Sequence, residues 1–107
     1  MKIDIGELEF IDERLREMAI EVEERFGEKT VTSLFRINDK GVHGQLPLRG
    51  IDLRCRTRRH GEEVERSVNE RWSYDKKRPK MKCCLFHSVG EGYHLHLQVH
   101  PGTMRRG

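Results

Sequence analysis

The stretch GEGYHLHLQV (residues 90–99) alternates aliphatic and polar side chains over its second half. A period of two predicts a β-strand, because successive side chains of a strand point to opposite faces of the sheet. The two faces then carry three polar and three aliphatic side chains, namely His94, His96 and Gln98 against Leu95, Leu97 and Val99. The polar row has three competing interpretations: a metal site, a solvated strand face, or a chance cluster.

Three further segments around this stretch have the composition of strands. The apolar run MKCCLFHS (81–88) precedes it, and VGEG (89–92) between the two runs predicts a hairpin. Earlier in the chain, KTVTSLFRI (29–37) is rich in β-branched and aromatic residues, and RGIDLRC (49–55) alternates apolar with charged residues. The sequence therefore predicts four strands.

Two helices are expected between and before these strands. Residues 7–26 place apolar side chains three and four positions apart, and Gly27 is a natural terminator. Residues 62–73 repeat apolar residues every four positions and predict a second, shorter helix. We expect a polar loop over RTRRHGEE (56–63) and a loose tail over 101–107.

The order of elements defines the expected fold. Helix, strand, strand, helix, strand, strand packs most simply as an α+β domain: a small, mostly antiparallel sheet with two helices on one face. At 107 residues the chain is long enough for one modest core, so we expect a single domain over 1–107.

Charge is distributed unevenly along the chain. The net charge is +3, but residues 1–28 carry ten acidic and four basic side chains, which leaves +9 for the remaining 79 residues. A basic body suits an anionic partner, either nucleic acid or an anionic cell-wall polymer, although a solvated surface explains it equally well.

Cysteine usage and hydropathy restrict the compartment and the metal chemistry. Three cysteines, with no CxxC pair, argue against a thiolate zinc knuckle. The acidic start of the chain predicts synthesis in the cytoplasm without a signal peptide, and the lack of a long apolar run predicts no membrane partner.

A carboxylate and several imidazoles are the candidate chemistry. Asp52 lies within an aliphatic strand, where a carboxylate needs a cation or donors to satisfy it. His43 precedes that strand, and His94 and His96 lie on another, with Glu91 in the turn before them. Two imidazoles and one carboxylate suit zinc with a fourth position open for water, and a nearby carboxylate can accept the proton of that water.

Three segments together resemble a known family. VTSLFR (31–36), GVHGQLPLRGIDLR (41–54) and GEGYHLHLQV (90–99) are similar, in this order, to segments of the zinc D-Ala-D-Ala carboxypeptidase and L-alanoyl-D-glutamate endopeptidase group. Many bacteriophage lysis enzymes belong to that group, and the hedgehog signalling domain shares its fold. The resemblance covers about half of the chain and implies a hedgehog-type α+β fold.

The resemblance also implies a metal site with one Zn²⁺ per chain. His43, Asp52 and His96 would be the three ligands. The family usually has six residues between the first two ligands, whereas eight separate His43 from Asp52, and an ungapped alignment places Gln45 at the first ligand position. Either a two-residue insertion restores His43 or the metal site is degraded; we favour the insertion.

The resemblance also implies roles in substrate binding and catalysis for three further residues. Arg36 would bind the substrate and polarise the scissile carbonyl, Glu91 would be the general base, and His94 would support the ligand His96 or carry a proton. The implied activity is hydrolysis of a peptide bond next to a D-amino acid in peptidoglycan stem peptides. The expected protein is encoded by a phage or prophage, is monomeric, and reaches the wall through phage lysis or a virion.

Two other functions compete with this hypothesis. The first is a non-catalytic virion or binding protein on the same scaffold, which the altered spacing before Asp52 favours. The second is a nucleic-acid-binding module that uses RCRTRR (54–59) and KKRPKMK (76–82). This second alternative leaves Asp52 and the two histidines of the strand idle and offers few aromatic side chains for stacking, so we expect no nucleic-acid partner.

Overall fold

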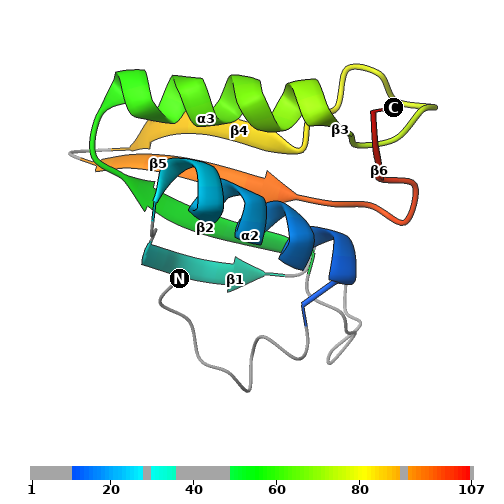
Figure 1. Ribbon diagram of the computed structural model, residues 1–107, viewed down its shortest axis with the longest axis horizontal. Coiled ribbons are helices and arrows are strands. Elements are labelled where there is room, and N and C mark those ends of the chain that lie inside the picture. The colour runs from blue at the N-terminus through cyan, green and yellow to red at the C-terminus, as the bar shows by residue number, and fades with distance from the viewer. Residues whose placement is uncertain (1–10, 28–29, 36–48, 90–91, 107) are drawn as a thin grey trace.

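Two helices pack on one face of a four-stranded antiparallel sheet (Figure 1). The computed structural model describes residues 11–27, 30–35, 49–89 and 92–106. The helices are α2 (Glu13–Phe26) and α3 (Arg58–Arg71). The strands of the sheet, in spatial order, are β1 (Thr30–Phe35), β2 (Gly50–Cys55), β5 (Gly92–Gln98) and β4 (Cys84–Val89). This architecture confirms the expected small α+β fold.

The alternation of the two central strands creates the core. Ile51 lies opposite Leu97, and Leu53 lies opposite Leu95, and all four side chains are fully buried against the helices. The helices contribute the facing layer from their apolar stripes: Leu15, Met18, Ala19 and Val22 from α2, with Val64 and Val68 from α3. The polar residues that alternate with these aliphatic residues along β2 and β5 therefore point to the opposite face of the sheet.

Helix α2 begins at Glu13, inside the expected range of 7–26; residues 7–10 of that range lie outside the described residues. Asp12 is its N-cap, and the Asp12 carboxylate accepts a hydrogen bond of 2.8 Å from the backbone N–H of Arg14. An Asp in this position satisfies an N–H group that has no partner inside the helix, which fixes the helix start. The helix ends as predicted, at Gly27, whose φ of 88° lies in the region that glycine tolerates best.

Helix α3 begins inside the segment that we expected to be a loop. Residues 58–63 are helical, and the Thr57 hydroxyl caps them by accepting from the backbone N–H of His60 at 3.1 Å. Gly61, a residue type that is unfavourable inside helices, is buried where the helix meets the sheet. A Cβ there would overlap ring carbons of Phe86 and lie 3.0 Å from the Cys55 Sγ. Close packing therefore explains the glycine.

Side chains of α3 cover the free edge of β4. The Asn69 amide donates to the backbone carbonyl of Cys84 at 2.8 Å and accepts from its N–H at 3.0 Å. One turn earlier, the Glu65 carboxylate accepts from the N–H of Phe86 at 2.7 Å. An edge strand otherwise presents a row of unpaired backbone groups, so these bonds close that edge and attach the helix to the sheet.

The end of the chain is held in place, in contrast to the loose tail that we expected. The short strand β6 (Met104–Arg105) pairs with β3 (Trp72–Ser73), which follows α3 directly and replaces the last residues of the expected helix. Thr103 is buried, and its hydroxyl donates to the carbonyl of Tyr74 at 2.8 Å. The described part of the tail is therefore a packed element of the domain.

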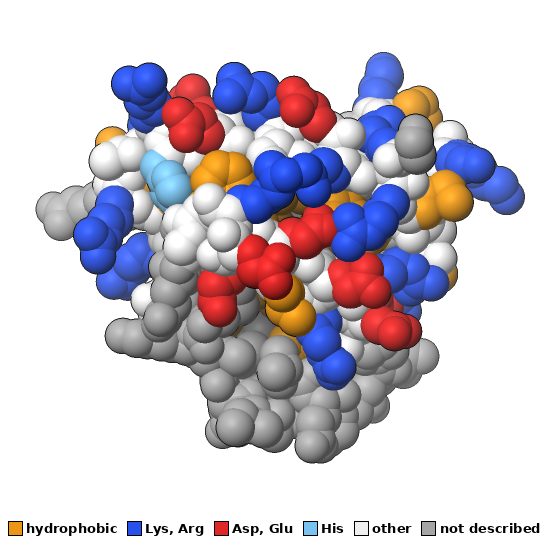
Figure 2. Space-filling model, in the orientation of Figure 1, with side chains coloured by type: hydrophobic (Ala, Val, Ile, Leu, Met, Phe, Trp, Pro, Cys, Tyr) orange, Lys and Arg blue, Asp and Glu red, His pale blue; other side chains and the backbone are white. Residues whose placement is uncertain are grey.

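The outer surface of the two helices is a mixed charged surface. Figure 2 shows acidic and basic side chains interspersed over α2 and α3. Arg105 from β6 pairs with both Glu17 and Glu21 of α2 and lies over the ring of Trp72, with its guanidinium carbon 4.5 Å from the ring centroid. Part of the acidity of the first segment is therefore compensated by the basic C-terminal segment. Within the described ranges no helix is both long enough and apolar enough to cross a membrane.

Candidate functional site

The open face of the sheet carries the polar residues of β2, β5 and β4 in cross-strand rows. Asp52 of β2 lies opposite His96 of β5, and Arg54 lies opposite His94. On the other side of β5, His87 of β4 lies opposite His94. Because residues two apart on a strand are about 7 Å apart, the two rows are close enough to form one site.

Asp52 and His96 are in direct contact across the two central strands. The Asp52 Oδ1 lies 3.0 Å from the His96 Nδ1. The Asp52 and His96 side chains are 23% and 15% exposed, so both are partly shielded from water. Forty-four positions separate them in the chain, and the register of β2 with β5 brings them together.

A third polar side chain of β5 completes this group. Gln98 is 8% exposed, and its Oε1 lies 3.0 Å from the His96 Nε2. The amide group of Gln98 also donates to the backbone carbonyl of Lys82 at 2.7 Å. Gln98 lies on the same face of β5 as His96, two residues further along the strand. This spacing is visible in the sequence, but the sequence analysis gave Gln98 no role in the site.

The structure brings together some of the expected site residues. Asp52 and His96 are in contact, and His94 lies in the next row, with its ring centroid 6.1 Å from that of His87. The other expected residues, Arg36, His43 with its alternative Gln45, and Glu91, lie outside the described residues. Among the residues that are described, no three His, Cys, Asp or Glu side chains form a group that could hold a metal.

The chemistry of the Asp52–His96 pair fits two positions of a zinc site. Carboxylate oxygen and imidazole nitrogen are ordinary zinc ligands, with bonds of about 2.0–2.2 Å. Two such ligand atoms in a tetrahedral site lie about 3.4 Å apart, a few tenths of an ångström more than the 3.0 Å seen here. A small outward movement of either side chain would bring the two atoms to that separation.

The described cysteines offer no competing ligand or nucleophile at this face. Cys55, Cys83 and Cys84 are buried and form no disulfide. Burial raises the pKa of the Cys83 thiol to about 12 and also raises that of Cys84, whose pKa the nearby Glu65 carboxylate raises further. Because the thiolate is the reactive form, Cys83 and Cys84 serve as small apolar residues of the core.

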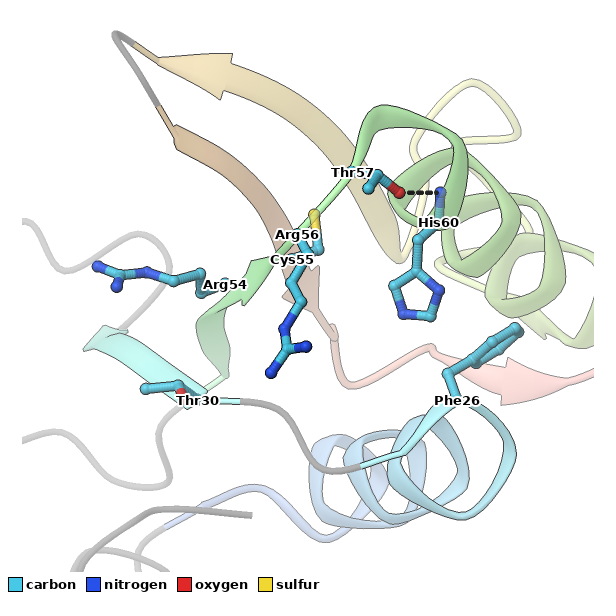
Figure 3. Close-up of a pocket in the computed structure, with 7 residues that line it drawn as sticks. All are labelled: Phe26, Thr30, Arg54, Cys55, Arg56, Thr57 and His60. Carbon is cyan, nitrogen blue, oxygen red and sulfur yellow. Dashed lines mark hydrogen bonds between the residues drawn. The ribbon is translucent and has the colours of Figure 1, made fainter.

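A second feature of the surface is a hollow at the C-terminal end of β2, between the end of α2 and the start of α3. Its volume is about 560 Å³, and its lining is Phe26, Thr30, Arg54, Cys55, Arg56, Thr57 and His60. Figure 3 shows Arg56 and His60 directed into the hollow, where the His60 ring meets the edge of Phe26 at 5.8 Å between centroids. Asp52, His94 and His96 do not line it.

Comparison with known proteins returns no match: neither a family model, nor a curated protein, nor a solved structure is similar to this chain.

Proposed function

We propose that this protein is a zinc-dependent peptidase that hydrolyses peptidoglycan stem peptides next to a D-amino acid, with one Zn²⁺ per chain and a phage or prophage origin. The observation that carries the proposal is the contact between the Asp52 carboxylate and the His96 imidazole on the open face of the sheet. Both residues occupy ligand positions in the resemblance to the zinc D-Ala-D-Ala carboxypeptidase group.

The arrangement of the strands supports the same proposal. Two of the segments that carry the resemblance, 41–54 and 90–99, contribute β2 and β5, which are neighbours in the sheet. A zinc site needs its ligands to converge, and the register places Asp52 opposite His96 without any rearrangement of the backbone. The nucleic-acid alternative gives this pair no role.

The roles of the chain's own residues follow from this assignment. Asp52, His96 and His43 would hold the metal, which when bound would supply Lewis-acid activation of a water molecule and of the substrate carbonyl. Glu91 accepts the proton of the attacking water and returns a proton to the leaving amine. Arg36 orients the substrate through its carbonyl oxygen, and its positive charge suits the anionic stem peptide.

His94 has a secondary role in this proposal. It lies on the same face as His96, two residues away along β5, and its other neighbour across the sheet is His87. A titratable imidazole in that position can carry a proton between the solvent and the leaving group, as an alternative to Glu91. His94→Gln is expected to reduce turnover less than any change of a metal ligand.

The test of this proposal is release of products from purified peptidoglycan. The wild-type protein is expected to release a D-amino acid or to expose new amino groups, and both a chelator and Asp52→Ala should abolish the release. Asp75→Ala is the matched control, because Asp75 also lies near an imidazole, with its Oδ2 3.7 Å from the His100 Nδ1, but is not part of the four-stranded sheet. Binding to peptidoglycan without any release, at every zinc concentration, would identify a non-catalytic protein instead.

A further inference from the structure

The hollow between the end of α2 and the start of α3 has a basic lining. Arg54 and Arg56 contribute two guanidinium groups, and His60 contributes an imidazole. Among the described residues, no Asp or Glu lines this hollow. A concave surface lined by one sign of charge concentrates its electric field, so the hollow attracts an anion.

Arg56 is the cation best placed to bind a ligand in the hollow. Figure 3 shows its side chain directed into the hollow, whereas the side chain of Arg54 extends away from Arg56 and His60. The nearby Arg59, which is not a lining residue, pairs with Glu63 at 3.6 Å. Arg56 has no carboxylate partner in the part of the chain that the structure describes. Its guanidinium can therefore pair with the charge of a ligand.

The hollow also has an aromatic wall. Phe26, at the end of α2, is half-buried and lines the hollow. The His60 ring meets the edge of the Phe26 ring, with the two ring planes at 82°, and the Thr57 hydroxyl holds the backbone N–H of His60 at 3.1 Å. An aromatic wall beside a guanidinium suits a ligand that joins an anionic group to an apolar or planar body.

The size of the hollow and the chemistry of arginine define the class of ligand. The volume of about 560 Å³ lies within the range of roughly 300–1,000 Å³ that is typical of small-molecule sites. A guanidinium binds phosphate through two parallel hydrogen bonds. A phosphate monoester carries a charge of about −1.5 to −2 at pH 7 and three acceptor oxygens, which gives it more charge than a carboxylate to offer a lining with several cations.

We propose that this hollow binds a small phosphate monoester, with its phosphate on Arg56 and its organic part against Phe26. The site is separate from the proposed peptidase site, because Asp52, His94 and His96 do not line the hollow. The inference therefore does not depend on the presence of zinc.

Titration of the wild-type protein with phenyl phosphate tests the site. Backbone ¹H–¹⁵N chemical shifts are expected to change in a saturable way around residues 54–60. Arg56→Gln should weaken the binding about 10–100-fold, because it removes a charge-assisted pair of hydrogen bonds. Arg59→Gln is the matched control: it removes the same charge from an exposed arginine outside the lining, so the affinity should change by less than about twofold.

Two further probes test the class of ligand. Inorganic phosphate lacks the ring that would contact Phe26, and benzoate carries a single negative charge, so each should bind about 3–10-fold more weakly than phenyl phosphate. Phe26→Leu keeps an apolar side chain and removes the ring. In this variant phenyl phosphate should lose its advantage over inorganic phosphate.

Three results would overturn the proposal. A wild-type protein whose shifts do not change with phenyl phosphate at about 10 mM has no such site. Equal weakening by Arg56→Gln and Arg59→Gln would mean that the basic segment attracts anions without a specific site. Inorganic phosphate or benzoate that binds as tightly as phenyl phosphate would refute the assigned class of ligand. Each of these results leaves the peptidase proposal standing, because none of them concerns zinc or Asp52.

Discussion

Asp52 and His96 lie directly opposite each other on the two central strands of the sheet, and their side chains meet at 3.0 Å on the face that the helices leave open. The same register places Leu53 opposite Leu95 in the core. A slip of one residue between β2 and β5 would therefore bury the polar pair and expose the core. The candidate site is positioned by the interactions that fold the protein.

Variants of the polar pair should remain folded. Asp52→Ala removes a partly exposed side chain and its hydrogen bond to His96, so it is expected to lower the free energy of unfolding by less than about 2 kcal/mol. His96→Ala removes the hydrogen bonds to both Asp52 and Gln98, so it is expected to cost about 1–3 kcal/mol. Leu53→Ala, in the core of the same strand, is expected to cost about 2–5 kcal/mol. Urea denaturation compares them, and equal losses for Asp52→Ala and Leu53→Ala would show that the pair is mainly structural.

The glycine in the second helix should not tolerate a methyl group. Alanine is favoured over glycine in a helix by about 1 kcal/mol, but a Cβ at Gly61 would overlap the Phe86 ring. Overpacking costs about 1–3 kcal/mol, so Gly61→Ala is expected to destabilise the protein by about 1–2 kcal/mol overall.

Two further variants test the reason for this loss. Phe86→Leu in the Gly61→Ala background should restore part of the lost stability, because the smaller side chain makes room for the methyl group. Glu62→Ala, at an exposed position of the same helix, should change the stability by less than about 0.5 kcal/mol. A Gly61→Ala protein that is more stable than the wild type would refute close packing of α3 on β4.

The hydrogen bonds of the Asn69 side chain should be needed to protect the free edge of β4. Asn69→Ala removes both hydrogen bonds to Cys84 and leaves that backbone without its partner, which is expected to cost about 1–3 kcal/mol and to increase aggregation through the exposed edge. Thermal unfolding and light scattering measure the two effects. The exposed neighbour Glu70, changed to Ala, serves as the control, and similar behaviour of both variants would contradict the edge role.

The protein should lose stability in alkali. The pKa of Cys83 is raised from 9.0 to about 12 in the folded protein, and burial raises the pKa values of Cys84 and Tyr74 as well. Above about pH 9 the unfolded thiols ionise first, so the unfolded state binds fewer protons and the free energy of unfolding falls as the pH rises. Urea denaturation at pH 8 and pH 10 should show the fall, with a smaller one in Cys83→Ala. A stability that is the same at both values would contradict this assignment.

Most of the fold follows from periodicity in the sequence. The alternation at Ile51 and Leu53 and at Leu95 and Leu97 predicts the two central strands, because a half-buried strand must alternate. The start of α3 was missed because the polar stretch 56–63 was expected to be a loop, and the close contact of Gly61 with Phe86 cannot be seen in the sequence. Glycine propensity is a local quantity, whereas this contact joins distant parts of the chain.

Part of the candidate site could also be predicted from the residue pattern of the strands. Asp52 and His96 are unusual in aliphatic strands, so they stand out without a structure. Their contact depends on register, which the sequence alone did not define. The link from His96 through Gln98 to the Lys82 carbonyl depends on a backbone atom, and no residue pattern reports where a carbonyl lies.

Zinc content tests the central proposal most directly. The purified wild-type protein, expressed with zinc and without chelator, should contain one zinc per chain by elemental analysis. His96→Ala should contain almost none, while His100→Ala, the histidine near Asp75, should keep the full amount. A wild-type protein without zinc, or a His96→Ala protein that retains it, would contradict the account.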